Sequence, residues 1–86
     1  MSSILEALRD HPMRHFAPGD VVIEQGTTTG LIFFLREGAV EVLKDGVTVA
    51  TASEPGAIFG DLSALLGEPH TATVRASQAC TFHIVS

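Results

Sequence analysis

Hydrophobic and polar residues alternate along most of this chain, from Met13 onward. A period of two places successive side chains on opposite faces of a β-strand, so the alternation predicts strands. Glycine, proline and aspartate interrupt it at short intervals, as the turns of a small all-β domain do. The pattern predicts about eight short strands, which lie at 13–16, 21–25, 31–35, 39–44 and 47–50, directly before Gly60, from Thr71 onward, and at 80–85.

Two stretches of the predicted β region are especially informative. Residues 31–35 are apolar on both faces, so this strand is expected to be covered on both sides or to meet a helix or a partner with its outer face. Asp45-Gly46 lies between two β-branched runs and is the strongest short-range signal in the chain, because this dipeptide favours a tight hairpin turn.

Helical signals occur at two places. Residues 3–10 carry one apolar stripe, and Pro12 ends that segment. A short apolar turn of helix follows Gly60, and Gly67 and Pro69 stop it. Short strands at regular spacing with two small helices predict a mainly β sandwich, roll or barrel.

The composition limits what such a domain does. The chain has 86 residues and a net charge of −5, from five basic and ten acidic residues, and it has no basic stripe for direct nucleic-acid binding. Cys80, the single cysteine, excludes an internal disulfide and a four-cysteine metal site, and we interpret it as a buried small hydrophobe. No apolar run is long enough to span a membrane and no signal peptide is visible, so we expect a cytoplasmic location. We expect one domain over residues 1–86, with an N-terminal helical segment at 1–12 and the β domain at 13–86.

The chemistry of the chain is concentrated between residues 58 and 76. Gly60 opens the short helix there, and the first N–H groups of a helix have no partner within the helix. The helix dipole adds partial positive charge at the same end. This stretch could therefore hold a phosphate group with its main chain.

The same stretch resembles the phosphate-binding cassette of the cyclic nucleotide-binding domain family, in which Phe-Gly-Glu opens a short helix and Pro-Arg-Thr-Ala-Thr-Val follows it. Here the two motifs read Phe59-Gly60-Asp61 and Pro69-His70-Thr71-Ala72-Thr73-Val74. Further motifs similar to those of the family precede the cassette, at 18–26, 38–42 and 45–46. The resemblance covers most of the chain and implies an antiparallel β-roll of the jelly-roll type.

The resemblance also implies a ligand, cAMP or cGMP, and no cofactor. The main chain of Gly60, Leu62 and Ser63 would meet the cyclic phosphate of that nucleotide. The hydroxyl group of Thr71 would touch the same phosphate. Gly60, Leu62 and Ser63 lie at the N-terminal end of the predicted short helix, and Thr71 follows the end of that helix.

Two side chains depart from the family pattern. Asp61 stands where the family has a ribose-binding glutamate and is one methylene shorter, so its hydrogen bond is expected to be lost or to pass through water. Its alternative role is that of a helix cap, which aspartate favours. His70 stands where the family has a phosphate-binding arginine, and histidine is mostly neutral at pH 7. Losing one charged hydrogen-bond partner costs about 1.5–3 kcal/mol, or roughly 10- to 100-fold in affinity.

The histidine at position 70 leads to a prediction about pH and leaves one alternative open. If His70 contacts the phosphate, binding should strengthen as the pH falls from 8 to 6, because protonation restores the missing charge. The alternative is that His70 is an exposed turn residue without a ligand. Arg75 is not expected to replace the arginine, because it lies five residues on and an unbroken strand points it to the opposite face.

Two functions remain open on these residues. The first is a ligand-sensing regulatory module with weakened nucleotide affinity, and the second is a degenerate β-roll that serves protein–protein contact or oligomerisation. An enzyme is not expected, because metal-dependent enzymes on related folds need clustered histidines and a carboxylate. The four histidines show no such cluster in sequence: His11, His15, His70 and His83.

The resemblance bears on the ends of the chain as well. The family domain usually continues past its last strand into one or two helices, and the final helix closes over the base as a lid. The given sequence stops at Ser86 with lid helices absent, which is expected of a truncated chain, of a piece of a longer protein or of a variant without a lid. We expect it to be a piece of a longer protein that works with an effector domain or a homo-oligomer partner.

Overall fold

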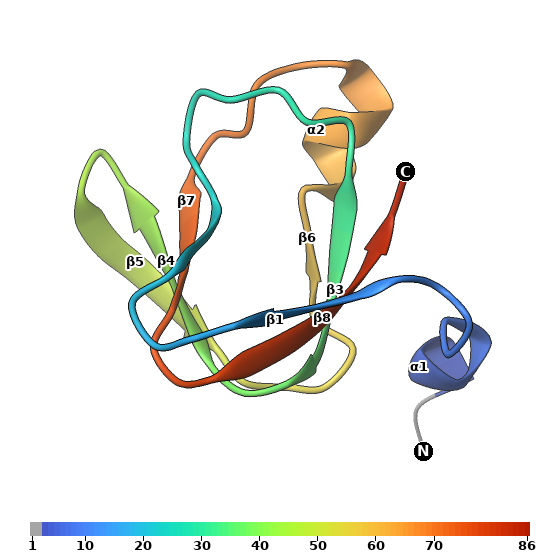
Figure 1. Cartoon of the computed structure of the whole chain (residues 1–86). Coiled ribbons are helices and arrows are strands. Elements are labelled where there is room, and N and C mark those ends of the chain that lie inside the picture. The colour runs from blue at the N-terminus through green and yellow to red at the C-terminus, as the bar shows by residue number, and fades with distance from the viewer. Residues whose placement is uncertain (1–2) are drawn as a thin grey trace.

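The computed structural model describes residues 3–86, and in that range the chain forms eight strands and two short helices (Figure 1). None of the helices in this range has the length and apolar character needed to cross a membrane. In chain order the elements are α1 (Ser3–Ala7), β1 (Met13–Phe16), β2 (Val21–Ile23), β3 (Ile32–Glu37), β4 (Val40–Lys44), β5 (Val47–Ala52), β6 (Ile58–Phe59), α2 (Asp61–Leu66), β7 (Thr73–Ala76) and β8 (Cys80–Val85).

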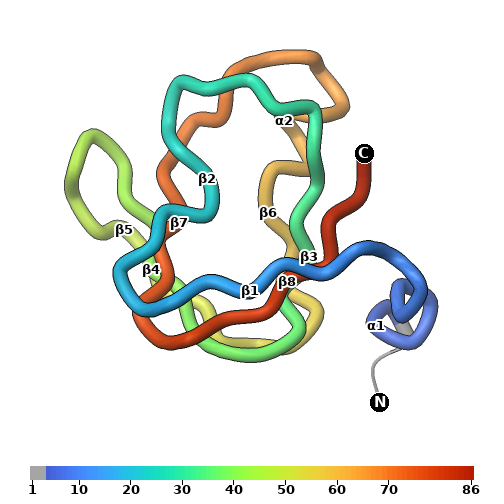
Figure 2. The backbone as a smooth tube through the Cα atoms, viewed as in Figure 1, coloured from blue at the N-terminus to red at the C-terminus, as the bar shows by residue number. Residues whose placement is uncertain are grey.

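The strands form two four-stranded sheets in which neighbouring strands are antiparallel. The first sheet has the order β1-β8-β3-β6 and the second the order β2-β7-β4-β5. Figure 2 shows the chain passing back and forth between the sheets, so consecutive strands often lie in different sheets. The prediction of a mainly β, antiparallel roll with about eight short strands and two small helices is confirmed.

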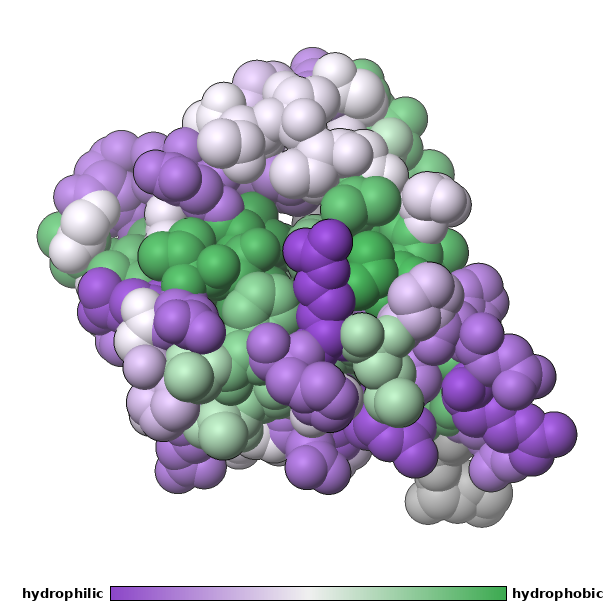
Figure 3. Space-filling view, viewed as in Figure 1, coloured by the Kyte–Doolittle hydropathy of each residue, from purple (hydrophilic) through white to green (hydrophobic). Residues whose placement is uncertain are grey.

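The core lies between the two sheets and is centred on Phe82, which is fully buried. Its ring makes edge-to-face contacts with Phe16, Phe33 and Phe59, at centroid distances of 5.8, 6.2 and 6.1 Å. Each such pair contributes about 0.5–1.5 kcal/mol beyond its buried area. Figure 3 shows hydrophobic side chains gathered in a band between the sheets. The remaining buried members of this core are Ile23, Leu35, Val40, Val74, Ala76 and Cys80.

Cys80 is 3% exposed, which confirms its interpretation as a buried small hydrophobe. Its thiol donates toward the carbonyl oxygens of Ala39 and Gln78, each at 3.0 Å. Burial raises the pKa of the Cys80 thiol above its ordinary value of 9.0. The nucleophilic thiolate is therefore disfavoured at this position.

The predicted hairpin joins β4 to β5. Asp45 and Gly46 have φ values of 52° and 82°, as a tight two-residue hairpin turn requires. The strand predicted to be apolar on both faces is β3, which pairs with β8 and β6. Phe33 and Leu35 are buried, while Ile32 and Phe34 on the other face are half-buried, so the second face of β3 is partly covered at these two residues.

Two predicted ends of elements differ from the structure. β2 ends at Ile23, two residues early, because the Gln25 N–H donates to the side-chain oxygen of Thr73 at 3.0 Å instead of pairing with a main-chain carbonyl. α1 ends at Ala7 rather than at residue 10. The N–H of Arg9 bonds to the carbonyl three residues earlier, at 3.4 Å, so the last turn tightens before the chain leaves the helix.

Candidate ligand-binding site

Gly60 shapes the start of the candidate site. It is the N-cap residue of α2 and has a φ of 81°, a conformation that residues with a side chain rarely adopt. A Cβ atom there would lie 2.9 Å from the Leu31 carbonyl oxygen and 3.0 Å from Cε1 of His70. Asp61 is the first helical residue and no side chain caps the helix, so the alternative role of Asp61 as the cap is wrong. Glycine holds the cap position because only glycine fits it.

The first N–H groups of α2 find no hydrogen-bond acceptor within residues 3–86. A helical N–H bonds four residues back, and the first residues of a helix have no helical carbonyl behind them. The first such bond is donated by Ala64 to the carbonyl of Gly60, at 3.0 Å. The amides of Asp61, Leu62 and Ser63 precede it and are available to an anion, together with that of Gly60.

His70 lies beside this row of amides. Its side chain is 5% exposed, so the alternative of an exposed turn residue is wrong. Its N–H donates to the carbonyl of Thr27 and its carbonyl accepts the N–H of Gly26, each at 2.8 Å, while Nε2 of the ring lies 2.7 Å from the hydroxyl oxygen of Thr29. These contacts bind the segment to a loop rather than to a strand, and β7 therefore begins two residues later than predicted, at Thr73.

A pocket of about 160 Å³ lies between the start of α2, His70 and the inner face of the second sheet. The six residues predicted for the site all line it: Gly60, Asp61, Leu62, Ser63, His70 and Thr71. The sequence pattern did not assign the apolar part of the lining, which consists of Ile23, Val42, Phe59, Ala72 and Val74. Most of these are ordinary strand positions, and no signal along the chain shows that they converge.

The charge of the pocket comes from few groups. Of the residues that line it, only Asp61 and His70 are titratable. Arg75 does not line it, because its guanidinium Nη2 donates to Oε2 of Glu41 at 3.0 Å on the other face of the sheet. That bond, with a hydrogen bond from the Thr48 hydroxyl, holds the pKa of Glu41 below its ordinary value of 4.5. As expected, Arg75 does not take the place of the family's arginine.

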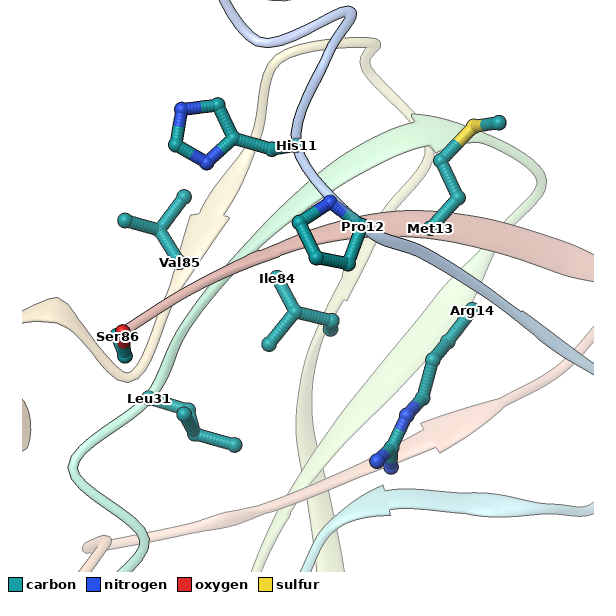
Figure 4. Close-up of a pocket in the computed structure, with 8 residues that line it drawn as sticks. All are labelled: His11, Pro12, Met13, Arg14, Leu31, Ile84, Val85 and Ser86. Carbon is teal, nitrogen blue, oxygen red and sulfur yellow. The ribbon is translucent and has the colours of Figure 1, made fainter.

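A larger hollow, of about 450 Å³, lies elsewhere on the molecule (Figure 4). It forms where the segment leading into β1 passes the end of β8, and its lining includes His11, Met13, Leu31 and Ile84. None of the six predicted site residues lines it. No motif or spacing in the sequence pointed to this hollow.

The other histidines make contacts within the fold. His83 is fully buried, its Nε2 accepts a hydrogen bond from Arg36 at 3.0 Å, and its Nδ1 lies 3.3 Å from the carbonyl oxygen of His11. Nδ1 of His15 lies 2.9 Å from the hydroxyl oxygen of Thr81. Within residues 3–86, no three His, Cys, Asp or Glu side chains gather closely enough to hold a metal ion.

Comparison with known proteins finds relatives of most of the chain. Residues 13–86 match the sequence profile of the cyclic nucleotide-binding domain family. The chain is 37% identical over 78 residues to a cAMP-dependent protein kinase regulatory subunit of Yarrowia lipolytica, and the match covers 91% of this chain and 20% of that protein. It is 34% identical over 86 residues to potassium/sodium hyperpolarization-activated cyclic nucleotide-gated channel 4 of Homo sapiens, covering 100% of this chain and 7% of the channel.

A solved structure shows the same fold. The cAMP-bound PfPKA-R structure superposes on this chain with a TM-score of 0.82 and 25% sequence identity. The match covers 87% of this chain and 26% of the other. This chain therefore spans only a minor part of the length of each of these three proteins.

Proposed function

Because the chain belongs to the cyclic nucleotide-binding domain family, we propose that the pocket at the start of α2 binds cAMP or cGMP and that the domain is a ligand-sensing regulatory module. The main-chain N–H groups of Gly60, Leu62 and Ser63 hold the cyclic phosphate. Thr71 lines the same pocket, and its hydroxyl group contacts the same phosphate.

One observation carries this proposal. The amides at the start of α2 have no acceptor within the described residues, and they border a pocket that the ring of His70 also lines. Hydrogen-bond donors without partners are stabilised by an acceptor ligand, and an anion suits the positive end of a helix. The six-residue helix contributes its first-turn amides, and the buried imidazole adds a second kind of donor group.

The affinity is proposed to be weaker than in a site that has arginine. A neutral imidazole offers one hydrogen-bond donor, whereas a guanidinium offers a charged planar fork that reaches two phosphate oxygens. Asp61 adds a carboxylate to the same pocket and contacts the ribose of the nucleotide directly or through water. The pocket is also small, so the sugar and phosphate occupy it and the base lies outside.

The domain is proposed to pass the ligand signal to another part of a longer protein or to a second copy. Its relatives here include a kinase regulatory subunit and a gated channel, and the matched stretch is 20% of the first and 7% of the second. A small domain of this kind supplies the ligand-binding equilibrium, and an effector domain supplies the response.

Calorimetric titration with cAMP and with cGMP, at pH 8 and at pH 6, tests the proposal. We expect the affinity to be higher at pH 6 than at pH 8, because protonation adds a positive charge to the hydrogen bond that His70 donates to the phosphate. His70→Gln should abolish this rise, whereas His15→Gln should retain it, because His15 lies on β1 and bonds to Thr81. Equal wild-type affinities at the two pH values would remove His70 from the site.

The second candidate function is that of a β-roll kept for protein contact. The observation that favours it is the exposure of the leucines of α2, since Leu62, Leu65 and Leu66 are 65%, 78% and 58% exposed. Clustered apolar side chains at a surface are typical of interaction sites. Thermal unfolding with and without millimolar cAMP or cGMP separates the two functions, because a ligand that binds only the folded state raises the melting temperature. An unchanged melting temperature would favour the contact function.

A further inference from the structure

The ring of His70 has one partner inside the fold. Its Nε2 lies 2.7 Å from the hydroxyl oxygen of Thr29, and that oxygen also accepts the N–H of Leu31 at 3.2 Å. A hydroxyl group has one hydrogen to donate and two lone pairs with which to accept. The Leu31 amide uses one lone pair, so the Thr29 hydroxyl still has its hydrogen to donate to Nε2 of His70, and one lone pair with which to accept.

The other ring nitrogen, Nδ1, has no hydrogen-bond partner among residues 3–86. Yet no side-chain nitrogen or oxygen in this range is both buried and unpartnered, so Nδ1 reaches open space. His70 as a whole is only 5% exposed, and the space that it borders is the pocket at the start of α2. A Cβ atom built on Gly60 would lie 3.0 Å from Cε1 and 3.6 Å from Nδ1, so this edge of the ring faces the N-cap of α2.

We propose that Thr29 is a positioning residue that holds neutral His70 as the tautomer with its proton on Nδ1, so that the ring donates a hydrogen bond into the pocket without being protonated. In a neutral imidazole one nitrogen donates and the other accepts. A hydroxyl group that donates to Nε2 therefore leaves the ring proton on Nδ1, where it faces an anion beside the amides of α2. The part of this inference that concerns the ligand rests on the proposed function.

The same contact accommodates the protonated ring. When His70 carries both protons, Nε2–H donates to the second lone pair of the Thr29 oxygen, and the hydroxyl hydrogen turns to solvent, where Thr29 is exposed. Nδ1–H keeps its direction in both states. Asp61 is the other titratable side chain that lines the pocket. Protonation therefore strengthens a donor that is already in place, and it does not create one.

The tautomer can be measured in the protein without any nucleotide. Long-range proton–nitrogen NMR spectra of ¹⁵N-labelled protein at pH 8 distinguish a protonated from an unprotonated ring nitrogen for each histidine. We expect Nδ1 of His70 to be protonated in the wild type and in Thr29→Ser, which keeps the hydroxyl group. Thr29→Val should move the ring toward the form with its proton on Nε2, which free histidine favours in water. Thr28→Val is the matched control, because the Thr28 hydroxyl makes no hydrogen bond with the described residues. A wild-type ring protonated on Nε2, or an unchanged tautomer in Thr29→Val, would overturn the inference.

Titration with cAMP then tests the consequence for binding. We expect Thr29→Val to weaken binding about tenfold at pH 8, because the ring then loses the partner that keeps its proton on Nδ1. Thr29→Ser and Thr28→Val should bind as the wild type does. Unchanged binding in Thr29→Val, or an equal loss in Thr29→Ser, which keeps the hydroxyl group, would contradict the inference. If the wild type binds no nucleotide, the proposed function fails, and the tautomer measurement still decides the role of Thr29.

Discussion

At the scale of single residues, Gly60 and His70 determine the shape of the pocket together. The imidazole packs where a side chain at position 60 would lie, and the left-handed φ of Gly60 turns the chain from β6 into α2. Gly67 at the other end of α2 also has a positive φ, 65°, but no atom lies within 4 Å of the position of its missing Cβ. Comparing a substitution at Gly60 with one at Gly67 therefore distinguishes the cost of a left-handed backbone from the cost of a steric contact.

Gly60→Ala should destabilise the protein more than Gly67→Ala. We expect about 1–2 kcal/mol for Gly67→Ala, because alanine must adopt a left-handed conformation. Gly60→Ala adds a contact with the Leu31 carbonyl and the His70 ring, which raises the loss by about another 1–3 kcal/mol. Urea unfolding followed by circular dichroism measures both. Equal losses would contradict the packing described for Gly60.

The cassette residues were predictable from sequence, whereas the surroundings of His70 were not. The glycine that opens the helix, the residues that end it and the spacing of the two motifs are all local signals. They were enough to place the residues from Gly60 to Thr71 around the start of one short helix. Burial of His70 depends on its contact with Thr29, which is 41 positions away in the chain. No periodicity records a contact between two loops, and Thr29 lies outside the predicted strands, helices and motifs.

At the scale of elements, the loop between β2 and β3 and the segment between α2 and β7 stabilise each other. Two main-chain bonds join them, one from Gly26 to His70 and one from His70 to Thr27. Gln25, in the loop between β2 and β3, ties this loop to the turn between β4 and β5 as well. Its side chain donates to the carboxylate of Asp45 at 2.8 Å and accepts the N–H of Asp45 at 2.9 Å. The strand interiors followed the alternation, while these loop contacts set where β2 ends and β7 begins.

The bond between β4 and β7 should make stability depend on pH. The Arg75 guanidinium and the Thr48 hydroxyl lower the pKa of Glu41 in the folded protein below 4.5, so the folded state binds this proton less readily than the unfolded state. The resulting stability is present above the unfolded pKa and is lost as the pH falls through the folded pKa. Glu41→Gln should therefore show a smaller drop in the urea midpoint between pH 5 and pH 3 than the wild type.

Glu68→Gln is the control for this measurement, because the structure gives Glu68 no ion pair among the described residues. It should show the same drop as the wild type. An undiminished drop in Glu41→Gln would mean that the pair with Arg75 does not stabilise the fold.

At the scale of the whole molecule, one aromatic cluster joins the four strands of the first sheet, because β1, β8, β3 and β6 each contribute one phenylalanine. Regular strand spacing and the resemblance together predicted the antiparallel roll. The division into sheets β1-β8-β3-β6 and β2-β7-β4-β5 was not predictable from spacing, because pairs such as β1 with β8 join the two ends of the chain. The pairing depends on burial of Phe82 among three other phenylalanines, which is a property of the assembled core.

Phe82→Ala should remove most of the stability of the domain. Truncating a buried phenylalanine costs about 3–5 kcal/mol, and small domains have only about 5–15 kcal/mol in total. We expect the melting temperature to fall by at least about 12 °C in a chain of this size. Val47→Ala is the surface control, since Val47 is 64% exposed, and it should change the free energy of unfolding by at most about 0.5 kcal/mol. Similar losses in the two variants would contradict the position of the core.

The central claim is that main-chain amides at the start of α2, beside His70, bind the phosphate of a cyclic nucleotide. Mapping backbone amide NMR shifts during titration with cAMP tests it most directly. The account predicts that the largest shifts occur at Gly60, Asp61, Leu62 and Ser63, with the ring of His70 responding and β5 unchanged. Shifts confined to the hollow between the segment leading into β1 and the end of β8, or no shifts at millimolar nucleotide, would contradict it.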